Sequence, residues 1–153
     1  MQDNTNCVAF SGVKRSGGDF NGKLNFDIAK VNVGSSLNPT SGEFTAPHAG
    51  HYYFSLSGVT GTTKGETTIS VIKNNRNMYI NEGNVKSGQN SVSYAWVEAM
   101  ESGDKLSMTV TANNLYADEE NQVVLNGFSI VSISSILSLS SLSTFRTLAR
   151  PYM

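Results

Sequence analysis

Residues 37–54 have the sequence LNPTSGEFTAPHAGHYYF and combine two turns with the start of a β-strand. Pro39 fixes its own φ and keeps the preceding residue out of the helical region, so a turn opens there. Gly42 can close this turn because glycine tolerates a positive φ. A second corner lies between Pro47 and Gly50. Two corners so close together predict short strands joined by tight turns.

Side chains of two kinds alternate along the segment after the second corner. Tyr52, Phe54 and Leu56 share one parity, and Tyr53, Ser55 and Ser57 share the other. A period of two is typical of a half-buried strand. Similar short segments, separated by clusters of Gly, Asn, Ser and Thr, continue to Val131 without a sustained helical period. The sequence therefore predicts an all-β fold, a sandwich or a jelly roll.

Two segments are predicted as loops, and one strand breaks its own pattern. Residues 13–22 and 58–65 are rich in glycine and polar residues, a composition typical of loops. In the strand that ends near Met100, Glu98 occupies a position of the apolar parity. A β-bulge before Gly103, or a strand edge that faces a partner, would accommodate this carboxylate.

The segment 37–54 resembles the signature of the globular head domain of complement component 1q, a family within the tumour necrosis factor-like superfamily. The family pattern is aromatic-Asn-x-x-Thr-Gly-x-Phe-x-x-Pro-x-x-Gly-x-Tyr-x-Phe. The matching positions are Asn38, Gly42, Phe44, Pro47, Gly50, Tyr52 and Phe54. Two positions depart from it, because Leu37 stands where an aromatic residue is usual and Ser41 replaces the threonine.

The rest of the chain follows the family in the same order. Residues 103–106 match its Gly-Asp-x-hydrophobic turn, and residues 125–128 resemble its last strand, with Leu125 in place of the usual phenylalanine. The resemblance implies a jelly-roll β-sandwich of about ten antiparallel strands over residues 8–131. A disordered segment, 1–7, is expected before this domain, and a Ser/Leu-rich tail, 132–153, follows it.

Composition excludes some classes of function. The 153 residues suit one domain, and a formal net charge of −1 with no basic run longer than Lys14-Arg15 argues against nucleic-acid binding. The polar N-terminus is not a signal peptide. The single cysteine, Cys7, is compatible with a bridge to another chain or with a free thiol.

The tail has an unusual composition, since residues 132–143 contain only Ser, Ile and Leu. It is too short and too rich in serine to span a bilayer. Its apolar residues recur every three positions, which does not make one helical stripe. We expect a disordered or weakly associating tail, and a helix that packs on the domain or on a second copy is the alternative.

No catalytic constellation emerges from the sequence, and an enzyme is not expected. His48 and His51 lie in the signature corner and suit no shared metal. Ligand-binding candidates are Tyr116, Asp118, Glu119 and Glu120, which form an acidic loop near the end where family members engage partners. Clustered carboxylates could bind calcium or a cationic group, and a solvated loop is the simpler alternative.

A second calcium candidate consists of Glu82 and Asn90, eight positions apart. Calcium-binding relatives place two aspartates at a similar separation near the trimer axis, whereas neither residue is aspartate here. Fewer carboxylates weaken calcium binding. No cofactor is therefore certain, and calcium is the only candidate.

The resemblance implies a bell-shaped homotrimer with the signature strand near the threefold contact. Tyr52, Tyr53 and Phe54 place aromatic rings on both faces of this strand, more than one sandwich core needs. Burial against neighbouring copies would cover the outward ring. We therefore expect these three residues at the trimer interface.

The resemblance also implies a function. We expect a secreted, extracellular and non-enzymatic recognition module of the innate-immune, pattern-recognition type, which binds carbohydrate or cell-surface protein in a lectin-like, multivalent manner. A receptor-binding signalling ligand of the same superfamily is the first alternative. A structural trimerisation or coat module is the second.

Overall fold

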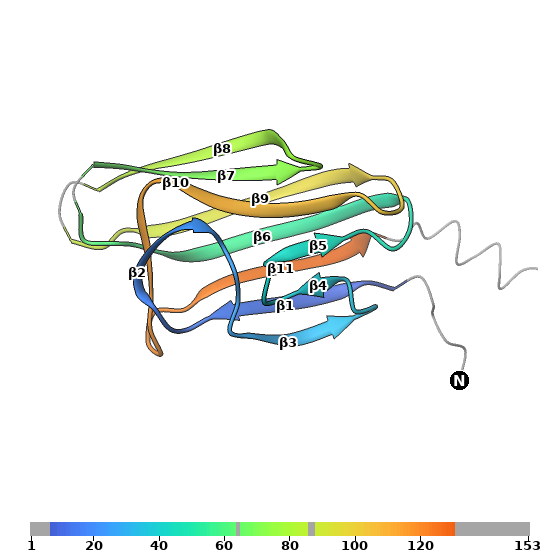
Figure 1. Ribbon diagram of the computed structural model, residues 1–153, viewed down its shortest axis with the longest axis horizontal. Helices are drawn as coiled ribbons and strands as arrows, with labels where there is room; N and C mark the ends of the chain where they lie inside the picture. The colour runs from blue at the N-terminus through green and yellow to red at the C-terminus, as the bar shows by residue number, and fades with distance from the viewer. Residues whose placement is uncertain (1–6, 64, 86–87, 131–153) are drawn as a thin grey trace, which may run out of the picture.

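The computed structural model describes residues 7–63, 65–85 and 88–130, with the backbone alone described at 79–85. This part of the chain forms eleven β-strands and contains no helix (Figure 1). The strands are β1 (Ala9–Lys14), β2 (Gly18–Lys23), β3 (Ile28–Val33), β4 (Leu37–Asn38), β5 (Glu43–Thr45), β6 (Gly50–Thr60), β7 (Gly65–Lys73), β8 (Arg76–Val85), β9 (Ser91–Met100), β10 (Lys105–Ala117) and β11 (Val123–Ile130). The predicted all-β fold is confirmed.

The strands pair into two antiparallel layers (Figure 1). The first layer has the order β3-β1-β11-β6-β9, and the second has the order β4-β5-β10-β7-β8. β2 pairs with the later part of β10. The layers connect where β10 pairs with the end of β6. This arrangement is the jelly-roll sandwich that the sequence predicts.

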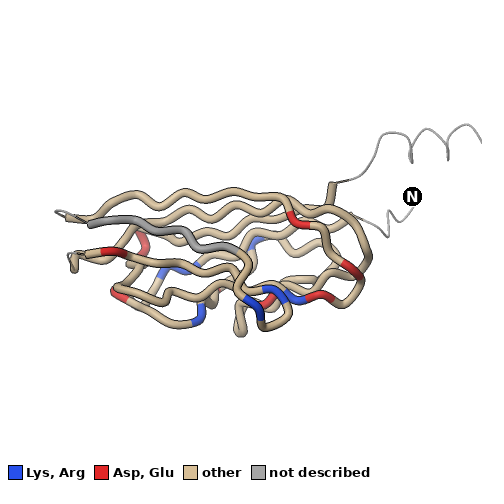
Figure 2. Tube along the Cα trace, turned by 90° about the horizontal axis from the view of Figure 1, so that it is seen from above, with Lys and Arg blue, Asp and Glu red and all other residues tan. Residues whose placement is uncertain are grey.

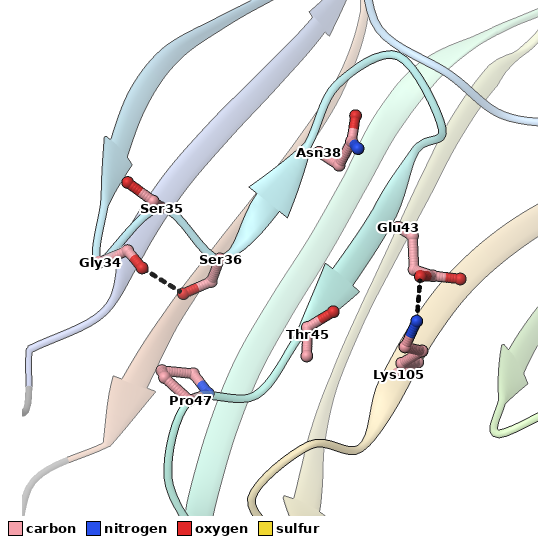
Figure 3. Close-up of a pocket in the computed structure, with 8 residues that line it drawn as sticks. All are labelled: Gly34, Ser35, Ser36, Asn38, Glu43, Thr45, Pro47 and Lys105. Carbon is pink, nitrogen blue, oxygen red and sulfur yellow. Dashed lines mark hydrogen bonds and ion pairs between the residues drawn. The ribbon is translucent and has the colours of Figure 1, made fainter.

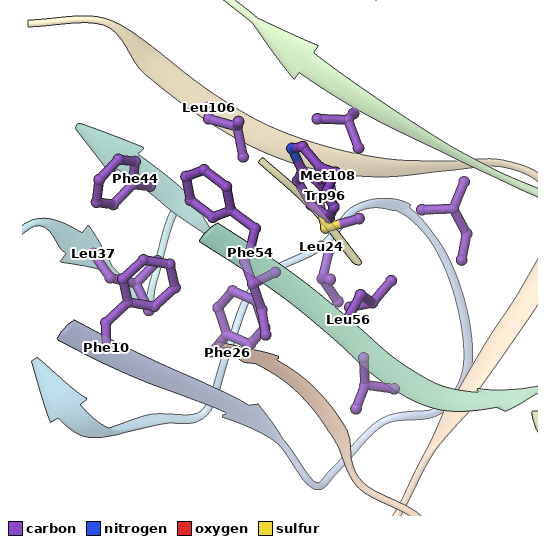
Figure 4. Packing of buried hydrophobic residues seen from close by; sticks show 14 of the residues in the cluster. Phe10, Leu24, Phe26, Leu37, Phe44, Phe54, Leu56, Trp96, Leu106 and Met108 are labelled. Carbon is purple, nitrogen blue, oxygen red and sulfur yellow. The ribbon is translucent and has the colours of Figure 1, made fainter. Parts of the chain in front are cut away.

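Buried rings from both layers meet in the middle of the sandwich (Figure 4). Phe44 on β5 has 0% exposure. Its ring centroid lies 5.2 Å from that of Phe10 and 5.3 Å from those of Phe54 and Tyr52. Such pairs stabilise by about 0.5–1.5 kcal/mol each beyond the apolar area they bury. Because Phe44 belongs to the second layer and its neighbours to the first, these contacts hold the layers together.

The alternation predicted for the signature strand is present in β6. Tyr52, Phe54 and Leu56 are buried, with no more than 1% of each exposed. Tyr53 and Ser55 are half-buried on the outward face. The strand is therefore apolar toward the core and mixed toward the outside.

The first signature turn depends on an asparagine and a glycine. The side-chain oxygen of Asn38 accepts hydrogen bonds from the backbone N–H groups of Thr40 at 3.1 Å and Ser41 at 3.2 Å. Gly42 has φ of +69°, and a Cβ at this position would collide with the backbone carbonyl oxygen of Leu24. Both the conformation and the space require glycine here.

The second signature corner packs against the turn between β9 and β10. The N–H of Ala46 donates to the carbonyl of Asp104 at 2.9 Å, and the N–H of Gly103 donates to the carbonyl of Ala46 at 2.8 Å. The hydroxyl of Ser102 donates to the carbonyl of Pro47 at 3.2 Å. Two motifs that lie far apart in the sequence therefore form one end of the sandwich.

Both loop predictions are wrong in part. β2 covers Gly18–Lys23, and all but its last residue fall in the predicted loop 13–22, while β6 continues to Thr60, inside the predicted loop 58–65. Phe20 on β2 stands opposite Leu115 on β10, and Thr60 is also opposite Leu115. Pairing with β10, which begins far along the chain, overrides the local glycine-rich composition.

Glu98 lies at no bulge, so that alternative is wrong, whereas β9 is the edge strand of its layer and a partner facing this edge stays a prediction. The pairing of β6 with β9 runs without a register shift past this residue. Glu98 is 6% exposed, and its carboxylate lies 2.9 Å from the ammonium of Lys73. Removal of one partner from such a buried pair costs about 3–5 kcal/mol, because the other charge is left uncompensated. This ion pair joins β9 of the first layer to β7 of the second.

Several predictions concern residues near the ends of the chain. Cys7 is exposed. The segment 1–7, predicted to be disordered, lies outside the described residues except for Cys7. The tail 132–153 lies entirely outside them. Among the residues that are described, no helix is long and apolar enough to cross a membrane.

We predict that Gly42→Ala destabilises the protein far more than Gly103→Ala. Both glycines have a positive φ, but a Cβ at Gly103 meets no atom within 4 Å. Gly103→Ala should therefore cost only the backbone penalty of about 1–2 kcal/mol. Gly42→Ala adds the collision with Leu24 and should cost more than about 4 kcal/mol. Urea unfolding of both variants measures the difference, and equal losses would contradict the role assigned to this turn.

Candidate functional site

The outward face of the first layer carries an apolar row that crosses all of its strands. The register places Val33 opposite Ala9, Ala9 opposite Phe128, Phe128 opposite Tyr53, and Tyr53 opposite Val97. We call these five residues the apolar row. They come from β3, β1, β11, β6 and β9, so only the folded sheet brings them together.

Much of the apolar row is open to solvent in the single chain. Val33 is 49% exposed, Phe128 46% and Val97 51%. The rings of Tyr53 and Phe128 pack against each other with centroids 5.0 Å apart. Ile130, 48% exposed, flanks the row on β11. A continuous apolar surface of this kind is typical of an interface with another protein.

Charge is sparse on the three strands β6, β9 and β11, whereas the outer strands β1 and β3 contain Lys14 and Lys30. β6, β9 and β11 together contain one Asp, Glu, Lys or Arg, namely Glu98, and its side chain is buried against Lys73. Figure 2 shows the same asymmetry, because the coloured charged residues gather in one layer and its turns while the strands of the other layer are mostly tan. Depletion of charge is characteristic of the centre of an interface.

The structure narrows the set of residues predicted at the trimer interface. Tyr52 and Phe54 are fully buried within the subunit, so neither has surface to offer to another copy. Tyr53 faces outward in the apolar row. The threefold contact itself stays a prediction, and of the three predicted residues only Tyr53 can make it directly.

Sequence reasoning missed Val97 and Phe128. Each has the outward parity of its strand, since Trp96 is buried before Val97 and Gly127 is buried before Phe128. An apolar residue on the polar face of a strand is the signal that could have found them.

One carboxylate of the acidic loop, that of Asp118, stabilises the loop's own backbone. The carboxylate of Asp118 accepts hydrogen bonds from the backbone N–H groups of Glu120 at 2.9 Å and Asn121 at 2.6 Å. The bond from Asn121 is the main reason why the pKa of Asp118 is lowered. A hydrogen bond with Asp118 is likewise the main reason why the pKa of Tyr116 is raised. Glu119 and Glu120 remain the exposed carboxylates of the loop.

The second calcium candidate is described only in part. Glu82 lies on β8 opposite Thr68, and its side chain is outside the described residues. The backbone of Asn90 is fixed by Thr60, whose hydroxyl accepts its N–H at 3.0 Å. Across the described side chains, no group of three or more His, Cys, Asp or Glu residues could hold a metal ion. A calcium site that uses Glu82 and Asn90 stays a prediction.

A family model provides one comparison with known proteins. The model of the C1q domain matches residues 9–130. Complement C1q and tumor necrosis factor-related protein 9 of Mus musculus is 29% identical over 115 residues, which cover 72% of this chain and 34% of that protein. This chain therefore matches about a third of the length of that relative.

Solved structures show the same fold at low sequence identity. The globular domain of the zebrafish complement 1qA protein has a TM-score of 0.63 at 20% identity, covering 81% of this chain and 97% of that one. Murine APRIL has a TM-score of 0.64 at 12% identity, covering 81% and 99%. Eiger TNF from S. frugiperda has a TM-score of 0.62 at 15% identity, covering 82% and 94%.

Proposed function

This chain belongs to the C1q domain family, and from that membership we propose that it is a secreted, trimeric and non-enzymatic recognition module that binds microbial or cell-surface ligands. The apolar row is the observation that carries the proposal. A face that is poor in charge and exposes several large apolar side chains is stabilised when another copy covers it. Three copies around one axis, as the family resemblance implies, would each cover part of this face.

Trimerisation would give such a module its binding strength. Each subunit presents the same loops in the same orientation, so a surface with repeated ligands can engage several of them together. Simultaneous engagement raises the overall affinity by a factor of about 10² to 10⁴ without any new contact. Individually weak sites, such as an exposed loop with Glu119 and Glu120, are then sufficient for recognition of a microbial or cell surface.

A receptor-binding signalling ligand is the second candidate function. Murine APRIL and the Eiger TNF share the fold with this chain over nearly their whole length. Fold similarity at this level of identity does not distinguish the two functions, because function depends on the binding site and not on the sandwich. The two candidates differ in the number of partners: pattern recognition covers many surfaces, whereas a signalling ligand binds one receptor.

We predict that Phe128→Asp converts a trimer to monomers without unfolding the subunit. The substitution places a charge in the centre of the apolar row, where an interface would bury it. Met78→Asp is the matched control, because Met78 is 42% exposed and Phe128 is 46% exposed, but Met78 lies on β8 of the second layer. Sedimentation velocity should give three times the chain mass for the wild type and for Met78→Asp. A wild type that sediments as a monomer at every concentration would refute the proposal.

Binding assays with the full chain distinguish the two candidate functions. We expect the labelled protein to bind bacterial surfaces or immobilised glycans, and Phe128→Asp to lose at least about tenfold in apparent affinity because avidity is lost. Saturable binding to a single cell-surface protein, with no binding to bacteria or glycans, would instead favour the signalling ligand.

Calcium is a separate and testable part of the proposal. A site made by Glu82 and Asn90, or by the acidic loop, should raise the melting temperature at millimolar calcium relative to a chelator, since a ligand that binds only the folded state stabilises it. Asn90→Ala should remove the shift if the first site is responsible. An unchanged melting temperature would eliminate both sites.

A further inference from the structure

Two hollows lie next to each other on the outward face of the second layer, opposite the face that carries the apolar row. The larger, about 430 Å³, includes Ser35 and Thr45 in its lining (Figure 3). The smaller, about 180 Å³, includes Asn75. Glu43 and Lys105 line both. We call the two hollows together the polar groove, with the pair formed by Glu43 and Lys105 between its halves.

Strand alternation explains why the side chains that line the polar groove on β5 and β10 point outward. Phe44 on β5 and Leu106 at the start of β10 are buried in the core. Their neighbours Glu43, Thr45 and Lys105 therefore face solvent. Thr45 stands directly opposite Lys105 in the pairing of β5 with β10. Since assembly through the first layer would leave this face uncovered, a trimer would present three polar grooves on its outside.

The charges in the polar groove compensate each other. The carboxylate of Glu43 lies 3.1 Å from the ammonium of Lys105 and 3.8 Å from that of Lys23. The side chains of Glu43 and Lys105 are 29% and 58% exposed, so both remain accessible to a ligand. A site with this balance presents strong donors and acceptors without a large field of either sign, which disfavours a highly charged ligand.

The remaining polar groups are available for hydrogen bonding. Within the described part of the chain, the hydroxyls of Ser35 and Thr45 and the side-chain amide of Asn75 make no hydrogen bond. Hydroxyls both donate and accept, and an amide offers two donors and one acceptor. Such groups match a ligand that itself carries many hydroxyls.

The backbone is also unusual around the polar groove. Of the four described residues other than glycine with positive φ, three line it: Ser35 at 50°, Asn74 at 49° and Asn75 at 64°. The two asparagines form the two-residue turn between β7 and β8, where such angles are expected. Ser35 belongs to no hairpin of this kind. A non-glycine residue held in this region costs about 1–2 kcal/mol, and such residues often occur at binding sites.

We propose that the polar groove binds a neutral oligosaccharide, with Glu43 and Lys105 contacting sugar hydroxyls at its centre. The larger hollow, of about 430 Å³, is open to solvent, so a chain of several sugar units could lie across it. The lining contains no aromatic side chain, so recognition in this groove would depend on hydrogen bonds from its polar groups. This inference rests on the proposed function, because a weak, shallow sugar site becomes effective when three copies act together.

The first test is binding of the full chain to polymers of neutral sugars, namely mannan and galactan, measured by biolayer interferometry. Glu43→Gln keeps the shape of the side chain but removes its charge, and Thr45→Val removes a hydroxyl. Each should weaken binding about tenfold, as expected for the loss of a hydrogen bond to a charged group or within a polar site. Glu66→Gln is the matched control, because Glu66 is exposed at the start of β7, whereas the polar groove lies at the other end of that strand. This variant should bind the sugars like the wild type.

The second test locates the site and does not depend on trimerisation. Hydrogen exchange of the wild type with millimolar free oligosaccharide should show protection in residues 34–45 and 105–107. Protection elsewhere, equal binding by Glu43→Gln and the wild type, or a preference for anionic glycans or peptides would overturn the inference. If the protein is a trimer that binds bacteria but not neutral sugars, only the inference about the polar groove is refuted. If it is a monomer that binds no microbial or cell surface, the proposed function is refuted.

Discussion

The contact of Phe44 with three rings of the opposite layer is the interaction on which the rest of the sandwich depends. The packing of the core rings also determines where a strand has no room for a Cβ atom. A Cβ at Gly127 would lie 2.5 Å from the ring of Phe10, and a Cβ at Gly12 would lie 2.9 Å from the ring of Phe26. The glycines of β1 and β11 are therefore a consequence of ring packing, since interiors this dense leave no room for another methyl group.

The parts of the fold that could be predicted from the sequence are those determined by neighbours along the chain. The parity of β6 and the turn closed by Gly42 are both properties of a few consecutive residues. β2 and Glu98 could not be predicted, because their partners are distant in sequence. Lys73 neutralises Glu98 from another strand and another layer, and no local pattern indicates that pairing.

The residues of the candidate site also divide into those that a local pattern predicts and those that depend on distant strands. Sequence reasoning identified Tyr53 because aromatic residues crowd its own strand, but the apolar row requires the register of five strands, which a single sequence does not give. The acidic loop was found by composition alone. Its first carboxylate, Asp118, proved to hold the loop together through the N–H groups of Glu120 and Asn121, a role that residues with short polar side chains often have in turns.

Strand alternation places the proposed assembly surface and the proposed binding groove on opposite faces of one small domain. β5 has only three residues, and the middle one, Phe44, is at the centre of the core, whereas Glu43 and Thr45 on either side line the polar groove. The packing that fixes Phe44 therefore fixes the positions of both outward side chains. Substitutions of the outward residues can change the chemistry of the groove without disturbing the rings, and the apolar row lies on the other layer, away from the groove. A rigid core with two unlike faces is the arrangement that multivalent recognition requires, because each copy must hold its site in the same orientation.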